Sequence, residues 1–482
     1  MTVAKPLPHD AAVLHVTGAA RYVDDIPAPA GTLSLAFGLS EVARGRITSV
    51  DLDAVRAAPG VVAVLTAADL PFANDVSPSA HDEPLLATGE VFYVGQPIFC
   101  VVATSHLAAR KAARLGRIGY QELPAILTID DALAADSRFE GGPVIWSKGD
   151  VDKALNGADR VIEGTLELGG QEHFYLEGQA AMAWPQEGGD MLVMSSTQHP
   201  TEIQHKVAEA LGRPMNAVRV EARRMGGGFG GKESQGNALA VACAVAAMQT
   251  GKPCKMRYDR DDDMVITGKR HDFRIDYRAG IDAEGRIAGV EFTQFCRCGW
   301  SMDLSLPVAD RAMLHSDNAY NLPAARITSH RLKTHTQSAT AYRGFGGPQG
   351  MVGIERVLDH IAHVLGKDPL EVRKRNFYRG QDTEGPTQTT PYHMEVEDFV
   401  LNEMVAELEA SSDYHARRKA VAAWNDANPI LKKGIALTPV KFGISFTLTH
   451  LNQAGALVHV YQDGSIHMNH GGTEMGQGLF QK

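Results

Sequence analysis

Three glycine-rich segments carry the residue types in this 482-residue chain that could hold a ligand. They are, in chain order, RRMGGGFGGKESQGN at 223–237, AYRGFGGPQG at 341–350 and HGGTEMGQG at 470–478. Tight packing of small residues explains any one glycine loop, but each of these segments also contains Gln, Arg or Glu. Bare backbone N–H groups suit an anionic ligand, above all at a helix N-terminus. The repeat of GFGG at 228–231 and 344–347 further indicates two loops with related roles.

The first loop comes close to two nucleotide-binding motifs and completes neither. Gly226, Gly228 and Gly231 fit the spacing G-x-G-x-x-G. However, no acidic residue about 20 positions later ends a second strand, as a dinucleotide site requires. Glu233 stands where a P-loop needs the Ser or Thr that holds magnesium. Both nucleotide sites are therefore poor explanations of this loop.

Local patterns indicate which elements hold the loops. Residues 217–224 alternate like a strand, and the apolar run 234–250, closed by Gly251, predicts a buried helix. Apolar residues recur at helical spacing over 351–365 and stop at Gly366, which predicts an amphipathic helix after the second loop. A hairpin built on a QDG turn is expected just before the third loop.

Composition excludes several classes of function. The net charge of −10 argues against nucleic acid as the main partner. No apolar run is long enough for a membrane helix, and the first residues lack the apolar core of a signal sequence. The cysteines are not spaced like a zinc or iron–sulfur set, and Cys296 and Cys298 are expected to fill one face of a strand. We expect a cytoplasmic protein that carries no cluster of its own.

The chain divides into three regions of mixed α/β (α+β) character. Alternating short strand and helix patterns predict a compact domain over 10–128. A second domain is expected over 145–380. The polar segment 379–398, rich in Thr, Gly and Pro, is a linker, and the third region runs over 395–482.

Longer motifs surround the glycine loops. They are VTGAARYVDD at 16–25, SSTQHPTEIQHK at 195–206, DRAMLHSDNAY at 310–320 and KFGISFTLTHLNQAGALVHVY at 441–461. Together with the glycine loops, this set resembles the molybdenum-cofactor-binding part of the aldehyde oxidase/xanthine dehydrogenase family, and of its xanthine dehydrogenases in particular. The resemblance implies an N-terminal α/β-hammerhead-like domain followed by molybdenum-cofactor-binding domains, the last one incomplete.

The resemblance also implies what the loops bind. They would hold molybdopterin, whose own sulfurs bind the molybdenum, so the missing cysteine set is expected. Gln198 would hydrogen-bond the oxo ligand of the metal, and Phe229 and Arg343 would lie near the metal without being its ligands. The cofactor-binding residues implied in this way are Gln198, Gly228, Phe229, Gly230, Arg343, Gly476 and Gln477.

Two further expectations concern segments beside the loops. Thr201 is expected to cap the helix after TQHP, with Gln204 as its partner. Residues 171–179, QEHFYLEGQ, contain a His and Glu but no H-E-x-x-H metal motif. We expect them to form a packed strand near the cofactor.

Substrate contacts are implied at five positions. Glu233 and Arg311 would hydrogen-bond the polar edges of a purine, Phe345 and Phe446 would sandwich its ring, and Thr447 would add a hydroxyl group. Taken singly, each residue has a simpler explanation. Glu233 could be a solvated charge on a loop, Arg311 could belong to a structural ion pair, and Phe446 could be a core residue. The motif context favours a site, because the Glu and Arg pair distinguishes purine-oxidising relatives from aldehyde-oxidising ones.

The family's general base is a Glu in a GEPP-like motif downstream of the third loop, and the 482 residues contain no such motif. No catalytic residue is therefore assigned, and we expect the chain alone to be inactive. The complete protein is expected to hydroxylate purines, from hypoxanthine through xanthine to urate, with water as oxygen source. Its electrons would pass to FAD and [2Fe-2S] clusters on a partner subunit in a heterotetramer. Alternatives are a molybdenum hydroxylase for aldehydes or other N-heterocycles, and a non-catalytic cofactor-binding fragment.

Overall fold

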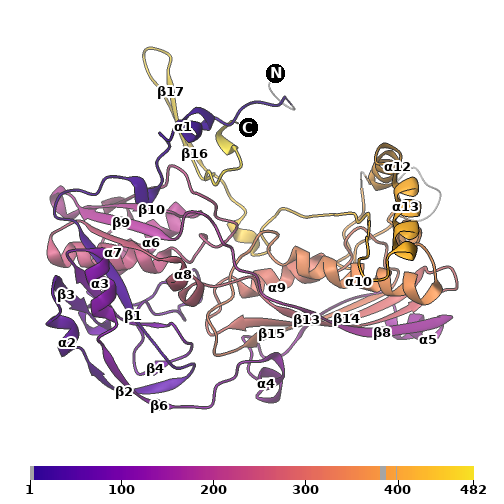
Figure 1. The fold of residues 1–482 in the computed structure, drawn as a ribbon, viewed down its shortest axis with the longest axis horizontal. Helices are drawn as coiled ribbons and strands as arrows, with labels where there is room; N and C mark the ends of the chain where they lie inside the picture. Colours follow the sequence, from indigo (N-terminus) through magenta and orange to yellow (C-terminus); the bar gives the residue numbers. More distant parts are fainter. Residues whose placement is uncertain (1–4, 380–386, 398, 482) are drawn as a thin grey trace.

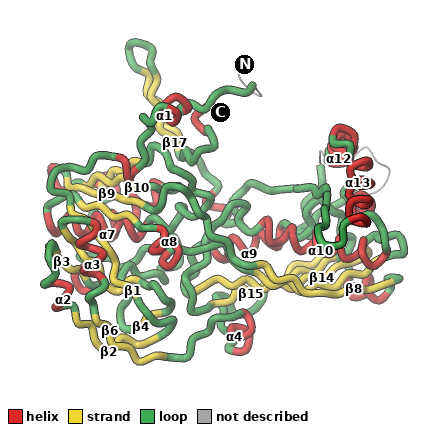
Figure 2. Tube along the Cα trace, viewed as in Figure 1, coloured by secondary structure: helices red, strands yellow, loops and turns green. Residues whose placement is uncertain are grey.

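The computed structural model describes residues 5–379, 387–397 and 399–481. Figure 1 shows two large lobes, each built on its own sheet, with the last residues of the chain lying above them. Helices and strands alternate through both lobes, and long loops run between the lobes in Figure 2. The fold is therefore mixed α/β, as the sequence predicts. No helix among the described residues is both long and apolar enough to cross a membrane.

The first lobe is built on a seven-stranded mixed sheet. Its strands, in spatial order, are β11 (Val218–Glu221), β10 (Met191–Ser195), β9 (Ala180–Pro185), β12 (Cys254–Arg257), β1 (Leu33–Leu39), β5 (Pro97–Ala103) and β3 (Val61–Leu65). Strand β12 pairs in parallel with β1, which joins strands from the predicted first domain to strands from the predicted second. One hydrophobic core consequently spans both regions of the chain.

Helices cover the faces of this sheet. Helix α7 (Asn237–Thr250) is almost entirely buried and ends at Gly251, whose φ of 65° is the left-handed conformation that stops a helix. This confirms the buried helix expected after the first glycine loop. Helix α6 (Pro200–Leu211) packs beside α7, while α2 (Asp53–Arg56) and α3 (His106–Ala113) pack near β3 and β5. A small sheet of β4 (Glu90–Val91), β2 (Gly45–Asp51) and β6 (Arg117–Glu122) completes the lobe.

The second lobe is built on a five-stranded sheet. The strands, in spatial order, are β7 (Val144–Lys148), β15 (Ala325–Lys333), β14 (Ile287–Gly299), β13 (Phe273–Ile281) and β8 (Arg160–Leu168). Helices α9 (Ser305–Leu314) and α10 (Gly347–Leu365) pack together over it. Helix α10 buries Ile354, Val357, Leu358 and Ile361 completely, and each such side chain contributes about 1.5–3 kcal/mol. The amphipathic helix expected after the second loop is thereby confirmed, with its end at Gly366.

The residues after 399 lie above the lobes. Helices α12 (Leu401–Ser411) and α13 (Tyr414–Ala427) stand on the second lobe in Figure 1. The expected hairpin is confirmed as β16 (Ala456–Val460) and β17 (Ile466–His470), and both strands are exposed along their whole length. Segments near the two ends of the described chain contact each other, since His9 Nε2 is 3.2 Å from Glu474 Oε1. The remaining helices are α1 (Ala12–Val16), α4 (Ile129–Ala134), α5 (Val151–Asn156), α8 (Arg260–Ile266) and α11 (Pro369–Asn376).

Two local expectations are wrong. Residues 171–179 form no strand, because distant backbone groups and side chains satisfy their polar groups in place of a neighbouring strand. Thr201 does not cap α6: the helix begins at Pro200, so Thr201 already lies inside its first turn. Gln204, the expected capping partner, donates instead to the carbonyl oxygens of Met215 and Val218, at 3.0 and 2.8 Å.

Candidate functional site

The first and third glycine loops meet at Gln198. Its Oε1 accepts a hydrogen bond from the backbone N–H of Gly230 at 2.8 Å, and Thr473 Oγ1 lies 3.5 Å from its backbone oxygen. A Cβ atom added to Gly228 would lie 2.6 Å from Gln198 Oε1 and 2.8 Å from Met475 Sδ, so a side chain there would displace one of these two groups. Gln198, Gly228 and Gly230, predicted as cofactor-binding residues, are thus neighbours.

The second loop joins the same cluster. The backbone N–H of Arg343 donates to the carbonyl oxygen of Phe229 at 2.8 Å. A Cβ atom added to Gly230 would lie 2.7 Å from the carbonyl of Ala341, so the two loops are in backbone contact. Segments separated by more than a hundred residues therefore present their glycines at one place.

The repeated GFGG sequence has a repeated conformation. Phe229 and Phe345 both have positive φ, 54° and 50°, and the glycine after each has a φ above 90°. A left-handed non-glycine residue costs about 1–3 kcal/mol, and such strain gathers at ligand sites. The side chain of Phe229 is also 41% exposed, so burial does not explain its position. The conformation is consistent with loops shaped for a ligand.

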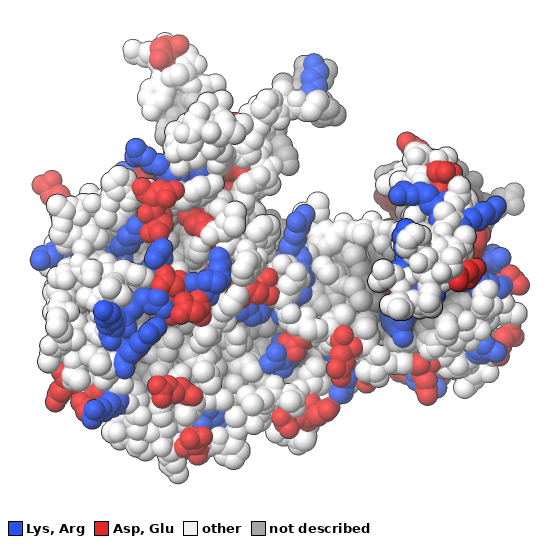
Figure 3. All heavy atoms as spheres, in the orientation of Figure 1, with Lys and Arg blue, Asp and Glu red and all other residues white. Residues whose placement is uncertain are grey.

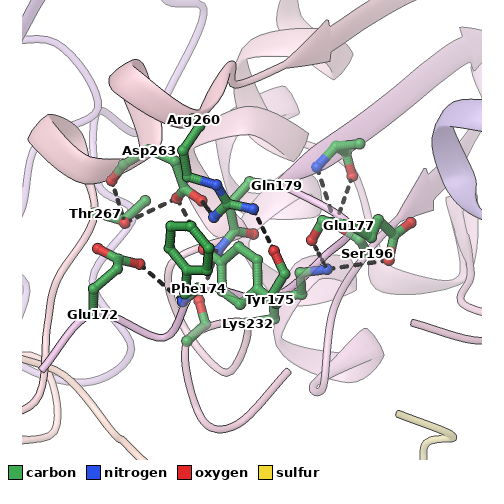
Figure 4. A network of polar contacts seen from close by, with 12 residues as sticks. Glu172, Phe174, Tyr175, Glu177, Gln179, Ser196, Lys232, Arg260, Asp263 and Thr267 are labelled. Atoms are coloured by element: carbon green, nitrogen blue, oxygen red, sulfur yellow. Dashed lines mark hydrogen bonds and ion pairs between the residues drawn. The ribbon is translucent and has the colours of Figure 1, made fainter. Parts of the chain in front are cut away.

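Residues 171–179 support the first loop from behind (Figure 4). Lys232 is fully buried and donates from Nζ to the backbone oxygen of Glu177 at 2.7 Å and to its Oε2 at 3.1 Å. The same Oε2 accepts from the backbone N–H of Gly226 at 2.8 Å, and Gln179 Nε2 donates to the carbonyl of Gly231 at 2.6 Å. Burial lowers the pKa of Lys232 while Glu177 opposes that shift. The lysine that seemed to belong to a P-loop is a structural anchor.

A second anchor holds the third loop. Both carboxylate oxygens of buried Glu474 accept backbone hydrogen bonds, from Gly476 at 2.8 Å, Gly478 at 3.0 Å and Leu479 at 2.7 Å. The side chain of Gln477 folds back onto its own loop, with Nε2 donating to the carbonyl of Thr473 at 2.9 Å. Gln477 is therefore occupied within the loop in this structure. Neither Glu177 nor Glu474 was identified from sequence, although the four glycines within four residues of Glu474 were a usable signal.

Four of the predicted substrate residues come together. The rings of Phe345 and Phe446 have centroids 5.0 Å apart at 50°, so they contact each other and leave no room between them for a planar ring. The guanidinium of Arg311 lies 5.7 Å from the Phe345 ring centroid and donates to the carbonyls of Gly443 and Ser445. Thr447 Oγ1 donates to the carbonyl of Pro307 at 2.8 Å. Sandwiching of a purine by these two rings would require one of them to move.

Glu233 lies in a different environment. Burial raises its pKa to about 7, and the negative charges of Asp303 and Glu202 add to that effect, while His199 opposes it. Near neutral pH the carboxyl group is therefore protonated in a large fraction of molecules. A protonated carboxyl donates a hydrogen bond, which an ionised one does not.

Sequence comparisons match these elements to known families. The molybdopterin cofactor-binding domain family matches residues 137–377 and again, with a second profile, 407–482. The α/β-hammerhead domain of aldehyde oxidase and xanthine dehydrogenase matches residues 17–124. The order of a hammerhead-like domain and cofactor-binding domains, expected from the motifs, is confirmed.

Individual relatives give the same result. The chain is 44% identical over 481 residues to the xanthine dehydrogenase/oxidase of Rattus norvegicus, covering 100% of this chain and 36% of that protein. It is 42% identical over 482 residues to the xanthine dehydrogenase of Drosophila subobscura, covering 100% of this chain and 35% of that protein. The chain thus spans about a third of the length of these curated relatives.

Solved structures share the fold. The aldehyde oxidoreductase of Desulfovibrio desulfuricans superposes with a TM-score of 0.83 at 24% identity, covering 96% of this chain and 52% of that one. The CO dehydrogenase of Oligotropha carboxidovorans gives 0.83 at 22% identity, covering 98% and 63%. Likeness at this identity concerns architecture alone. Together, the family matches show that the chain belongs to the aldehyde oxidase and xanthine dehydrogenase family of molybdopterin cofactor-binding proteins.

Proposed function

We propose that this chain holds the molybdenum cofactor and the purine pocket of a xanthine dehydrogenase, which hydroxylates hypoxanthine to xanthine and xanthine to urate. The observation that carries the proposal is the state of Glu233 and Arg311. Arg311 is 4% exposed and Glu233 is half-buried, and among the described residues neither forms an ion pair. A buried ionisable group without an opposite charge is costly, and such groups concentrate at binding sites.

Arg311 has donors to spare. Its Nε is buried with no hydrogen-bond partner among the described residues, and its other contacts are backbone carbonyls, not carboxylates. Burial lowers its pKa, which shows the cost of keeping the cation there. Glu233, with a pKa of about 7, is present near neutral pH both as a protonated carboxyl, which donates a hydrogen bond, and as a carboxylate, which accepts one. The pair would recognise the oxygen and nitrogen atoms at two edges of an oxopurine.

The loops fit an anionic pterin cofactor. Among the described residues, the Arg343 guanidinium and the Nε2 of Gln198 have no hydrogen-bond partner, so both donors are available to a ligand. Gly476 has a φ of 105° and nothing within 4 Å of where a Cβ would lie, so its backbone faces open space that a ligand can approach. The one carboxylate of the third loop, Glu474, is already saturated by backbone N–H groups.

Each residue then has a defined task. When bound, the molybdenum cofactor supplies the two-electron redox chemistry of hydroxylation, with water as the oxygen source. Gln198 would orient the cofactor through its amide N–H₂ without adding charge, while Arg343 would offset negative charge. Phe229 would pack against the cofactor from its strained loop. Phe345 would stack on the purine after Phe446 moves aside, and Thr447 would lie beside the ring.

Electrons would leave through FAD and [2Fe-2S] clusters on a partner subunit, in a cytoplasmic heterotetramer. The resemblance of the motifs supports this arrangement, and the five free, buried thiols are consistent with a reducing compartment. Figure 3 shows acidic and basic side chains interspersed over one face of the molecule.

The substrate profile of the complete protein tests the proposal. It requires kcat/KM for xanthine, for an aromatic aldehyde and for an N-heterocycle without oxo groups, measured with molybdenum-loaded protein. A preference for xanthine is expected. A preference for either other substrate would make the protein a related molybdenum hydroxylase. Cofactor binding without turnover of any substrate would make it a cofactor-binding protein only.

A further inference from the structure

Two cysteines and a histidine share one face of the sheet in the second lobe, and the proposed function uses none of them. Cys296 and Cys298 lie two positions apart on β14, so their side chains leave the same face. Phe273 on β13 pairs with Cys296 in antiparallel register. The pairing continues one residue before β13, where the carbonyl of Asp272 accepts a backbone hydrogen bond from β14 at 3.2 Å. This register places His271 opposite Cys298, on the face of the two thiols.

The ligand-type atoms of the three residues are close together. The Sγ atoms of Cys296 and Cys298 are 3.6 Å apart, and a ring nitrogen of His271 lies within 4.8 Å of both. Metal–sulfur bonds of about 2.3 Å at a tetrahedral angle put two sulfur ligands about 3.8 Å apart. A disulfide needs about 2.05 Å. The spacing of the two thiols is therefore that of two ligands of one ion.

The histidine is prepared to act as the third ligand. His271 is 1% exposed, and its Nε2 lies 2.8 Å from Ser305 Oγ. Its Nδ1 is buried and has no hydrogen-bond partner among the described residues. Burial lowers the pKa of His271 to about 3, so the ring is neutral and one nitrogen carries a free lone pair. Metal-binding histidines have this arrangement, with the other nitrogen held by a neighbouring group.

The sequence favours small apolar fillers at Cys296 and Cys298. That role explains two buried thiols, since both residues are 0% exposed. It does not explain the unpartnered imidazole nitrogen of His271, because a buried polar group without a partner is costly. The spacing of the cysteines alone could not reveal such a site, since the third side chain comes from the neighbouring segment.

The residue types select a soft cation. Thiolates favour Cu⁺ and Zn²⁺ among the metals of proteins. Structural zinc sites almost always have four ligands, whereas this group offers three, which is sufficient for Cu⁺. Each thiol that becomes a thiolate releases its proton to solvent.

The electrostatic surroundings also favour a bound cation. Burial, Cys298 and Asp272 raise the pKa of Cys296 well above its usual value, and the charge of Arg331 opposes that shift. A coordinated metal ion removes the proton of such a thiol by supplying the missing positive charge. Two thiolates with one Cu⁺ leave a single negative charge. Arg331, which pairs with Cys296 across β14 and β15 and is 2% exposed, lies where it offsets this charge.

We propose that Cys296, Cys298 and His271 bind one thiophilic cation, Cu⁺ in preference to Zn²⁺, as a structural ion. The ion would tie β14 to the segment that precedes β13. Ser305 begins α9, and Gln349 in α10 donates to the carbonyl of His271 at 3.2 Å, so the ion would fix the base on which both helices rest. The site is separate from the proposed hydroxylation and holds whatever the substrate is.

The direct test is the metal content of the full chain. Because the three residues are buried, the ion has to enter while the chain folds, so the protein is expressed with added copper and purified under reducing, anaerobic conditions. Wild type should retain about one copper ion per chain. Cys296→Ala, Cys298→Ala and His271→Gln should each lose nearly all of it. Cys254→Ala removes a buried thiol from the first lobe and is the matched control, which should keep its copper.

Two further measurements on wild type do not depend on whether the variants fold. X-ray absorption at the copper edge should show two sulfur neighbours and one nitrogen. A parallel expression with added zinc should give a lower metal content than the one with copper. The copper-loaded chain should also melt at a higher temperature than the chain expressed without metal, because an ion that binds only the folded state stabilises it.

Four results would overturn the proposal. The first is a wild-type chain that retains neither copper nor zinc, and the second is one that retains zinc but no copper. The third is a Cys296→Ala or His271→Gln variant that is folded by its melting temperature and keeps the wild-type copper content. The fourth is a freshly isolated chain in which mass spectrometry without reductant finds Cys296 joined to Cys298 as a disulfide.

Discussion

The side-chain oxygen of Gln198 accepts a hydrogen bond from the backbone N–H of Gly230 at 2.8 Å, and this fixes the direction of its amide. Oxygen faces the protein, so the N–H₂ group is directed away from the loop as a donor. Two roles therefore meet in one side chain: the oxygen holds the first glycine loop in shape, and the nitrogen is available to the cofactor. Different substitutions at Gln198 should separate these two roles.

Gln198→Ala should lose both roles. Gln198→Glu should lose only the hydrogen-bond donor that faces the cofactor. In the Ala variant the N–H of Gly230 loses its partner, which costs about 1–3 kcal/mol. The Glu variant keeps an acceptor but loses the donor, so its melting temperature should stay near wild type while kcat falls about 100-fold. Molybdenum content, melting temperature and kcat of both variants check this. Equal melting temperatures in the two variants, or a Glu variant with wild-type kcat, would contradict it.

Lys232 should matter for stability and not for phosphate binding. Lys232→Met leaves the Glu177 carboxylate buried without its cation, a change that costs about 3–5 kcal/mol. Urea unfolding of the variant against Lys252→Met, an exposed lysine on the same lobe, measures the difference. A stable Lys232→Met protein that has lost only its cofactor would instead show that the lysine binds the phosphate.

Glu474 should make the third loop sensitive to acid. Burial raises its pKa, but backbone N–H groups, Gly478 first, outweigh this and hold the pKa below its usual value. A lowered pKa means that the stabilisation is complete above the unfolded pKa and is lost as pH falls through the folded one. Limited proteolysis near residues 470–478 should therefore accelerate below pH 4.5 or so, near the ordinary Glu pKa of about 4.3. Glu474→Gln should be cleaved rapidly at neutral pH already; equal protection of wild type and variant would argue against the anchor.

Features that depend on neighbouring residues could be predicted from the sequence, whereas features that depend on contacts between distant parts of the chain could not. Helices α7 and α10 were predicted correctly, because apolar periodicity and a terminal glycine are local signals. The strand expected at 171–179 was wrong, because Glu177 bonds to the backbone of Val23 and Gly226, both far away in the chain. The clustering of the three loops was implied by resemblance alone, since no spacing in the sequence encodes it.

The contacts with the substrate were the hardest part to predict. The residue types at Glu233 and Arg311 indicate contacts with a polar ligand. The raised pKa of Glu233, however, comes from its burial and then from the charge of Asp303, seventy residues later in the chain. The contact between Phe345 and Phe446 likewise depends on how the segment after Lys441 crosses α9 and α10. Such features arise from tertiary packing.

The most direct test of the account is the paired substitution of its two purine contacts in the complete enzyme. If Glu233 and Arg311 grip opposite edges of xanthine, Glu233→Val and Arg311→Met should each lower kcat/KM for xanthine by about 100- to 1,000-fold. This corresponds to about 2–4 kcal/mol of lost transition-state binding. Turnover of a simple aromatic aldehyde and molybdenum content should stay at wild-type values. Equal losses for xanthine and the aldehyde at full molybdenum loading would contradict the account, and loss of molybdenum itself would make both residues structural.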